Sequence, residues 1–178
     1  MQNEIITKLS LVELDISNGN VLSSVDKDVW KVAAFDRIHG TKNHVVGFLE
    51  NFGADIGAFA STWSFHENDL IVIGSNDSDM ALAANTLRKI QGGLVVVKSG
   101  KIQALLQLKL AGIISIDSFE KVSSNFEQIN NTIVDSGCKF SRPHLIPLFL
   151  PFLALPSIRI LSRGIVDVKK RLFLNPIC

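Results

Sequence analysis

Residues 57–97 constrain the fold of this chain more than any other stretch. They contain two apolar runs typical of buried strands, one on either side of a polar loop. A helix is predicted next, because the short polar and acidic side chains after Gly74 can accept hydrogen bonds from its first N–H groups. Gly92-Gly93 is expected to end it, since glycine adopts the left-handed conformation without strain. The predicted elements are a strand at 58–64, a loop at 65–69, a strand at 70–73, a helix that begins within 75–79 and a strand at 94–97.

The rest of the chain adds further strands and a second long helix. Apolar side chains recur every three or four residues over 118–135, which predicts a helix closed by Gly137. The segment 144–161 is very apolar, but three prolines interrupt it, so buried loops and short elements are expected there. Further strands are predicted at 4–15, 20–24, 30–35, 44–51, 102–108 and 165–174, with tight turns at Asn18-Gly19 and Ser99-Gly100. A short helix is the alternative for 44–51.

This order of elements predicts the fold class. Strand-like segments outnumber the two long helices and do not alternate regularly with them. That pattern favours an α+β fold, with mostly antiparallel β-sheets and two long helices packed on them, over a doubly wound one. No repeat, low-complexity tract or linker divides the chain, so residues 1–178 are expected to form a single domain.

Composition narrows the classes of function and partner. The formal net charge is +1 and no stripe of Lys or Arg is present, which argues against nucleic-acid binding. Segment 144–161 is too short and too broken to span a membrane, so no membrane partner is expected. Cys138 and Cys178 form no disulfide framework, and the N-terminus has no signal-peptide pattern. These features predict a cytoplasmic location.

The polar loop at 65–69 holds the first candidates for chemistry. His66 and Glu67 are the catalytic candidates, because imidazole and carboxylate groups transfer protons near neutral pH. Asn68 and Asp69 are candidates for binding substrate. The alternative for the whole group is a solvated surface loop. No ligands lie at the spacing of a zinc motif and no glycine-rich phosphate loop is present, so no metal site or bound cofactor is expected.

Arg37 and His39 form the second candidate group. They follow the apolar run 30–35 and stand in a polar loop, where a guanidinium and an imidazole can hold an anion or a substrate edge. The alternative is that they only cap the end of a strand. Neither group identifies a reaction by itself.

Several dispersed blocks of sequence resemble the C-terminal domain of adenine deaminases of the amidohydrolase superfamily. They occur in the family's order and spacing and cover nearly the whole chain. The blocks are Gly57-Ala58-Phe59-Ala60-Ser61, residues 71–81 (IVIGSNDSDMA), residues 92–97 (GGLVVV), Leu110-Ala111-Gly112, residues 152–156 (FLALP) and residues 163–168 (RGIVDV).

Two loops depart from the family pattern. Where the family usually carries His-Asp-Ser-His-Asn, this chain has Phe65-His66-Glu67-Asn68-Asp69, so both family histidine positions hold other residues. Where the family usually has Arg-His before its glycines, this chain has Arg37-Ile38, with His39 one position later. Roles of the family histidines therefore do not transfer to this chain directly.

The resemblance implies a complete enzyme that hydrolyses adenine to hypoxanthine and ammonia, using a divalent transition metal held in a (β/α)8 barrel. This chain contains no such barrel and is expected to be inactive alone. Its expected partner is a barrel-bearing amidohydrolase domain or subunit, and 144–161 is a candidate interface for a homo-oligomer if that segment is exposed. Two alternatives stay open, a stand-alone purine-binding or regulatory module and an independent enzyme that uses His66 and Glu67.

Overall fold

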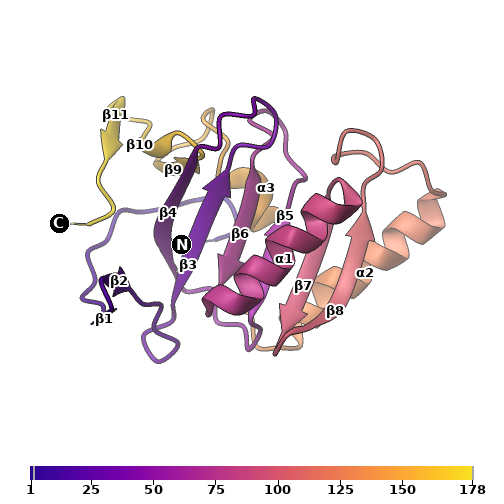
Figure 1. The fold of residues 1–178 in the computed structure, drawn as a ribbon, viewed down its shortest axis with the longest axis horizontal. Helices are drawn as coiled ribbons and strands as arrows, with labels where there is room; N and C mark the ends of the chain where they lie inside the picture. Colours follow the sequence, from indigo (N-terminus) through magenta and orange to yellow (C-terminus); the bar gives the residue numbers. More distant parts are fainter. Residues whose placement is uncertain (2, 178) are drawn as a thin grey trace.

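The protein is built around one six-stranded antiparallel sheet with the order β4-β3-β6-β5-β7-β8 (Figure 1). The computed structural model describes residues 1 and 3–177. The strands are β3 (Val29–Phe35), β4 (His44–Glu50), β5 (Ala58–Ser61), β6 (Leu70–Gly74), β7 (Gly93–Lys98) and β8 (Lys101–Gln107). The predicted α+β class with mostly antiparallel sheets is confirmed.

Among residues 1 and 3–177, three helices and two small sheets complete the fold, where two long helices are predicted. The third helix has only four residues and follows a 3-10 turn, as expected for a segment interrupted by prolines. The helices are α1 (Asp77–Ile90), α2 (Phe119–Val134) and α3 (Ile146–Phe149), with the 3-10 turn η1 (Pro143–Leu145) before α3. The small sheets pair β1 (Ile16–Ser17) with β2 (Asn20–Val21), and β10 (Gly164–Asp167) with both β9 (Ile158–Leu161) and β11 (Leu172–Leu174).

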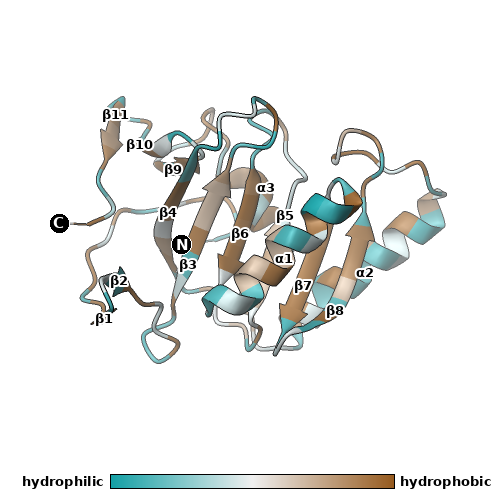
Figure 2. Ribbon diagram, in the orientation of Figure 1, coloured by the Kyte–Doolittle hydropathy of each residue, from teal (hydrophilic) through white to brown (hydrophobic). Residues whose placement is uncertain are grey.

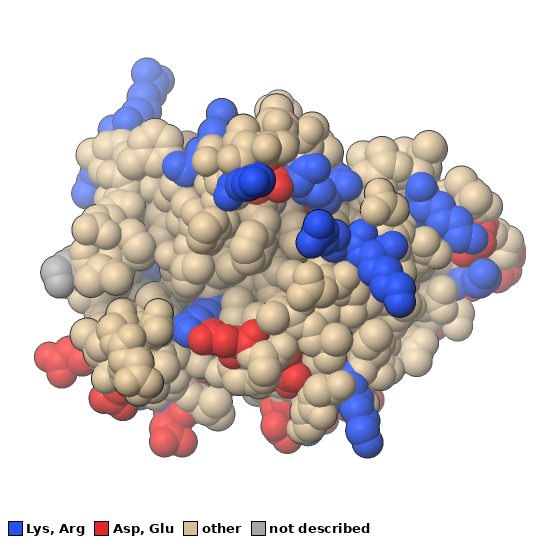
Figure 3. Space-filling view, in the orientation of Figure 1, with Lys and Arg blue, Asp and Glu red and all other residues tan. Residues whose placement is uncertain are grey.

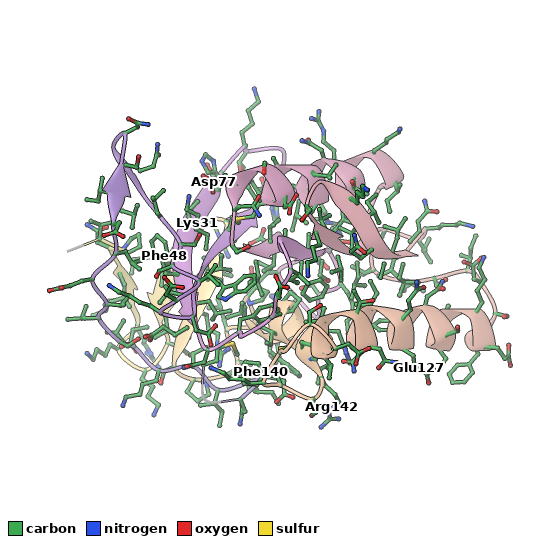
Figure 4. All side chains as sticks on the ribbon, turned by 90° about the horizontal axis from the view of Figure 1, so that it is seen from below. Lys31, Phe48, Asp77, Glu127, Phe140 and Arg142 are labelled. Carbon is green, nitrogen blue, oxygen red and sulfur yellow. The ribbon has the colours of Figure 1, made fainter. Side chains whose placement is uncertain are left out.

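Alternating side chains of the central strands give the sheet two apolar faces, as the period of a strand requires. One face packs on α1 through Met80, Ala83 and Leu87. The other face packs on Ile129 and Ile133 of α2, and on α3 and β9. Hydropathy colouring marks the central strands as the most apolar part of the ribbon (Figure 2). Seen from below, α1 and α2 form separate layers on opposite sides, with Lys31 and Asp77 pointing toward each other on the α1 side (Figure 4).

Local signals explain both ends of the first long helix. The Asn76 side chain accepts a hydrogen bond from the N–H of Asp79, which satisfies one of the free donors of the first turn. At the other end Gln91, and not the predicted glycine, adopts the left-handed cap conformation with φ 67°. Gly92 and Gly93 follow in extended positive-φ conformations that carry the chain into β7. The glycine pair therefore serves the entry to the strand as much as the end of the helix.

Two strand predictions are wrong and two strands are shorter than predicted. Residues 4–15 form no strand, because their backbone groups enter no ladder with the strands near them, β9 and β4, which they contact only through side chains. Residues 165–174 form the hairpin β10–β11 instead of one strand, since Lys170 N–H bonds the Asp167 carboxylate and Arg171 turns the chain at φ 55°. The strand predicted at 58–64 ends at Ser61, and the one predicted at 20–24 ends at Val21.

No helix among the described residues is both long and apolar enough to cross a membrane.

Candidate functional site

The candidate residues lie in loops that meet at one end of the sheet. Strands β3, β5 and β8 run in the same direction, because every neighbouring pair in the sheet is antiparallel and these three occupy alternate positions in the sheet order. The loops that follow them, 36–43, 62–69 and 108–118, therefore leave from the same end of the sheet. This end, named here the loop end, is the upper end of the sheet in Figure 1.

Arg37 joins the three loops. Its Nε donates to the carbonyl of Asn68 at 3.1 Å, and its Nη2 donates to the carbonyl of Ala111 at 2.9 Å. Gly112 makes room for the guanidinium, because a Cβ at this position would stand 2.7 Å from Nη1. Burial lowers the pKa of Arg37, and nearby Asp69 opposes that shift. Arg37 thus positions backbone, whereas the sequence suggests either an anion-binding or a strand-capping role.

His39 lies in an exposed turn of loop 36–43 and contacts Asp36, not the residues that Arg37 binds. Its N–H and that of Ile38 donate to Asp36 Oδ1, while Thr41 donates to the other carboxylate oxygen. The His39 ring is largely exposed and its Nδ1 lies 3.3 Å from the same Asp36 Oδ1. The Thr41 hydroxyl and these backbone N–H groups hold the pKa of Asp36 well below its usual range. Asp36 organises the turn that displays His39.

The loop at 65–69 presents an ion-paired network. Glu67 lies 3.2 Å from His66 Nδ1 through one oxygen and 3.2 Å from Arg163 Nη2 through the other. Asn68 adopts a left-handed backbone with φ 56°, and its N–H donates to the Ser64 hydroxyl. Within the described chain its Oδ1 is buried and has no hydrogen-bond partner. The loop therefore presents an exposed imidazole held by a largely buried carboxylate, next to a buried amide oxygen that stays unsatisfied within the described residues.

Asp69 faces away from this network. It is only 6% exposed, and its Oδ2 accepts the N–H of Ser162 at 2.7 Å. Burial raises the pKa of the Asp69 carboxyl despite that hydrogen bond. The structure therefore brings His66 and Glu67 together but assigns Asp69 to holding the β9–β10 turn. Across residues 1 and 3–177, no group of three His, Cys, Asp or Glu side chains could hold a metal ion, so the donors present do not fit the metal that the resemblance implies for a complete enzyme.

Two residues of this site, Arg163 and Phe65, are not predicted as site residues from the sequence. The sequence indicates only a turn at Arg163, because its partner Glu67 is remote in sequence. Phe65 is largely exposed and its ring packs on Phe149 and Phe152, with centroids 5.5 and 5.7 Å apart. A phenylalanine between polar residues in a loop is the one signal that could have indicated its exposure.

The loop end also differs from the opposite end in its surface chemistry. Lys and Arg side chains gather along it and along α1, whereas Asp and Glu gather mainly at the other end (Figure 3). Large apolar side chains are exposed on its loops, which is the surface expected of a contact with another polypeptide. The exposed apolar side chains of these loops and of the first residue of α2 are Ile38, Phe65, Leu110, Ile114, Ile116 and Phe119.

Replacing Arg37 by methionine should loosen the loop end. The variant loses two hydrogen bonds to carbonyls from different loops, so the free energy of unfolding should fall by about 1–3 kcal/mol. Backbone amides of residues 62–69 and 109–114 should exchange faster with solvent, as measured by hydrogen exchange and mass spectrometry. Arg163→Met is the matched control, because this exposed side chain has one surface ion pair and its loss should cost about 0–1 kcal/mol. Equal stability and exchange in both variants would contradict the positioning role of Arg37.

Comparison with known proteins gives consistent matches over almost the entire chain. The family model described as "Adenine deaminase C-terminal domain" matches residues 4–171. An adenine deaminase of Cenarchaeum symbiosum (strain A) is 56% identical over 174 residues, which is 98% of this chain and 29% of that protein. An adenine deaminase of Clostridium botulinum (strain ATCC 19397 / Type A) is 37% identical over 92% of this chain and 27% of its own length. "Adenine deaminase 1" of Rhizobium meliloti (strain 1021) is 36% identical over 96% of this chain and 30% of its own length.

Proposed function

Since the chain belongs to the adenine deaminase C-terminal domain family, we propose that it acts as the accessory domain of an adenine deaminase and is not catalytic alone. The observation that carries this proposal is the coverage of the relatives. The chain spans 29% of the length of the Cenarchaeum symbiosum adenine deaminase while nearly all of the chain is matched. Most of such an enzyme therefore lies outside the region matched here.

We place the catalytic chemistry in the part of the enzyme that lies outside this chain. A metal-bearing barrel of the amidohydrolase type would supply the Lewis acid and activated water for hydrolysis of adenine to hypoxanthine and ammonia, a step of cytoplasmic purine metabolism. The barrel is either a domain of the same polypeptide or a separate subunit.

The loop end is the surface that we place against the rim of the barrel's active site. Its exposed apolar side chains provide contact area, and its basic residues are arranged around them. Arg37 holds the loops together through the Asn68 and Ala111 carbonyls, and on loop 62–69 the Phe65 and His66 side chains are exposed, with Glu67 paired to the His66 ring. An exposed aromatic ring and an exposed imidazole suit the face and the edge of a purine. His66, Glu67, Asn68 and His39 are proposed as contacts at this rim, with Arg37 and Asp69 as positioning residues.

A chimera tests the accessory role directly. This chain replaces the matching region of the Cenarchaeum symbiosum enzyme, and ammonia release from adenine is measured. We expect kcat/KM within about tenfold of the parent, a difference of about 1.4 kcal/mol in transition-state stabilisation. The isolated chain should release no ammonia. A folded, metal-loaded chimera without activity, or adenine hydrolysis by the isolated chain, would overturn the proposal.

Two further measurements distinguish contacts at the rim of the barrel's active site from a stand-alone purine-binding module. A His66→Ala, Glu67→Ala double variant of the chimera should raise KM, and unchanged kinetics would remove these residues from the rim. Calorimetry of the isolated chain with adenine and hypoxanthine should give no heat at millimolar ligand. Measurable binding would instead favour a stand-alone purine-binding or regulatory module.

A further inference from the structure

The segment 8–14 has the character of a strand but pairs with nothing in this fold. It lies between the anchored residue Thr7 and the β1–β2 hairpin. Its sequence, KLSLVEL, mixes apolar and polar residues in the loose alternation of a strand. None of its backbone N–H or C=O groups bonds another backbone group within the described part of the chain, although the Glu13 carbonyl accepts Lys27 Nζ at 2.7 Å. The segment therefore exposes the unpaired backbone groups of an edge strand.

The side chains of the segment are as open as its backbone. Leu11 is 83% exposed and Leu9 is 52% exposed, on a chain whose core strands are buried throughout. Val12 is also exposed, and only Leu14 is half-buried. Two neighbouring leucines left in solvent would each gain on the order of 2 kcal/mol if fully buried. Covering this segment is thus favourable both for its backbone and for its side chains.

Contacts at both ends hold the segment in place. The Thr7 hydroxyl donates to the Ile158 carbonyl at 2.8 Å and accepts the Ile158 N–H at 2.8 Å. The N–H of Leu22 donates to the Asp15 carbonyl at 2.9 Å. The Ser10 hydroxyl donates to Glu50 of β4, at the edge of the main sheet. The segment is consequently presented along one side of the domain (Figure 1), with Leu9, Leu11 and Val12 exposed.

We propose that residues 8–14 add as a strand to the edge of a β-sheet in the barrel-bearing part of a complete adenine deaminase. The proposal rests on the proposed function, because the occupant is the part of the enzyme that lies outside this chain, about 70% of the Cenarchaeum symbiosum relative's length. In such strand addition, backbone hydrogen bonds give affinity and alternate side chains enter the partner's surface. Leu9 and Leu11 would enter on one side of the strand, and Val12 and Leu14 on the other.

Hydrogen exchange on the chimera tests the pairing. The alternate amides of residues 8–14 that face the partner strand should exchange at least about tenfold more slowly in the chimera than in the isolated chain, because pairing closes those N–H groups. The same measurement on the intact Cenarchaeum symbiosum enzyme, at the residues matched by 8–14, decides the question should the chimera not assemble. An active chimera whose 8–14 amides exchange as fast as in the isolated chain would overturn the strand and leave the accessory function standing. An inactive chimera in which these amides are protected would instead overturn the accessory function and support the added strand.

A proline pair supplies the matched mutational test. Leu11→Pro, Val12→Pro removes consecutive N–H groups, so one of them must face the partner strand whichever register applies. The pair should leave the urea midpoint of the isolated chain unchanged and lower the thermal midpoint of the chimera. Asp26→Pro is the control, because Asp26 occupies an exposed turn position in which proline is favoured. A destabilised isolated chain, or a chimera insensitive to the pair, would refute the proposal.

Discussion

Gly93→Ala should cost this domain a large part of its stability. Gly93 opens β7 with φ 144° and lies opposite Gln107 of β8. A Cβ here would stand 2.0 Å from the Leu106 carbonyl oxygen and 3.1 Å from the Gln107 Cα. Both are backbone atoms of the neighbouring strand, so relief requires β8 to move. We expect a loss of about 4 kcal/mol or more, against a total of about 5–15 kcal/mol for a typical domain.

Urea unfolding followed by circular dichroism measures this loss. Gly100→Ala is the matched control in the adjoining hairpin, because Gly100 also has positive φ, 73°, but no atom lies within 4 Å of the position that a Cβ would occupy there. That variant should cost only the left-handed strain of about 1–2 kcal/mol. Similar midpoints for the two variants would show that the β7–β8 pair tolerates the added methyl group.

Arg159→Met should have the second largest effect on stability. Arg159 is 0% exposed and its guanidinium donates to four carbonyls. Three of them are Leu155 at 3.0 Å, Phe149 at 3.1 Å and Ile5 at 3.0 Å, and the fourth belongs to Pro156. Burial lowers the pKa of Arg159 to about 10, so the side chain stays charged at neutral pH. Methionine fills similar space but leaves these acceptors without donors, which should cost about 3–5 kcal/mol.

Comparison with two other variants isolates the cause. Arg159→Lys should not restore stability, because one ammonium cannot donate to four separated carbonyls. Arg142→Met alters an exposed side chain and should change the free energy of unfolding by no more than about 0.5 kcal/mol. A wild-type midpoint for Arg159→Met would mean that the buried carbonyls find other donors. Because Arg159 also holds Ile5, this variant should additionally release the N-terminal segment, visible as faster exchange of amides 5–7.

The candidate site illustrates which features are readable along the chain. His66 and Glu67 are adjacent in sequence, and the structure keeps them paired. Arg163, 96 residues further along the chain, pairs with Glu67, and no local sequence pattern predicts this contact. Arg37 reaches Ala111 across 74 residues for the same reason. Neighbouring partners can be predicted from sequence, whereas partners joined by the sheet order cannot.

By itself, the sequence determined the strands of the main sheet, both long helices, the start of the first helix within 75–79, and the family, because these depend on periodicity, local hydrogen bonding and ordered blocks of residues. Only the tertiary structure decided that residues 4–15 stay unpaired and that 165–174 fold into a hairpin. A strand requires a partner edge that supplies hydrogen bonds, and the position of that edge is a property of the assembled sheet. The same reason separates Asp69, turned toward Ser162, from the His66–Glu67 pair beside it.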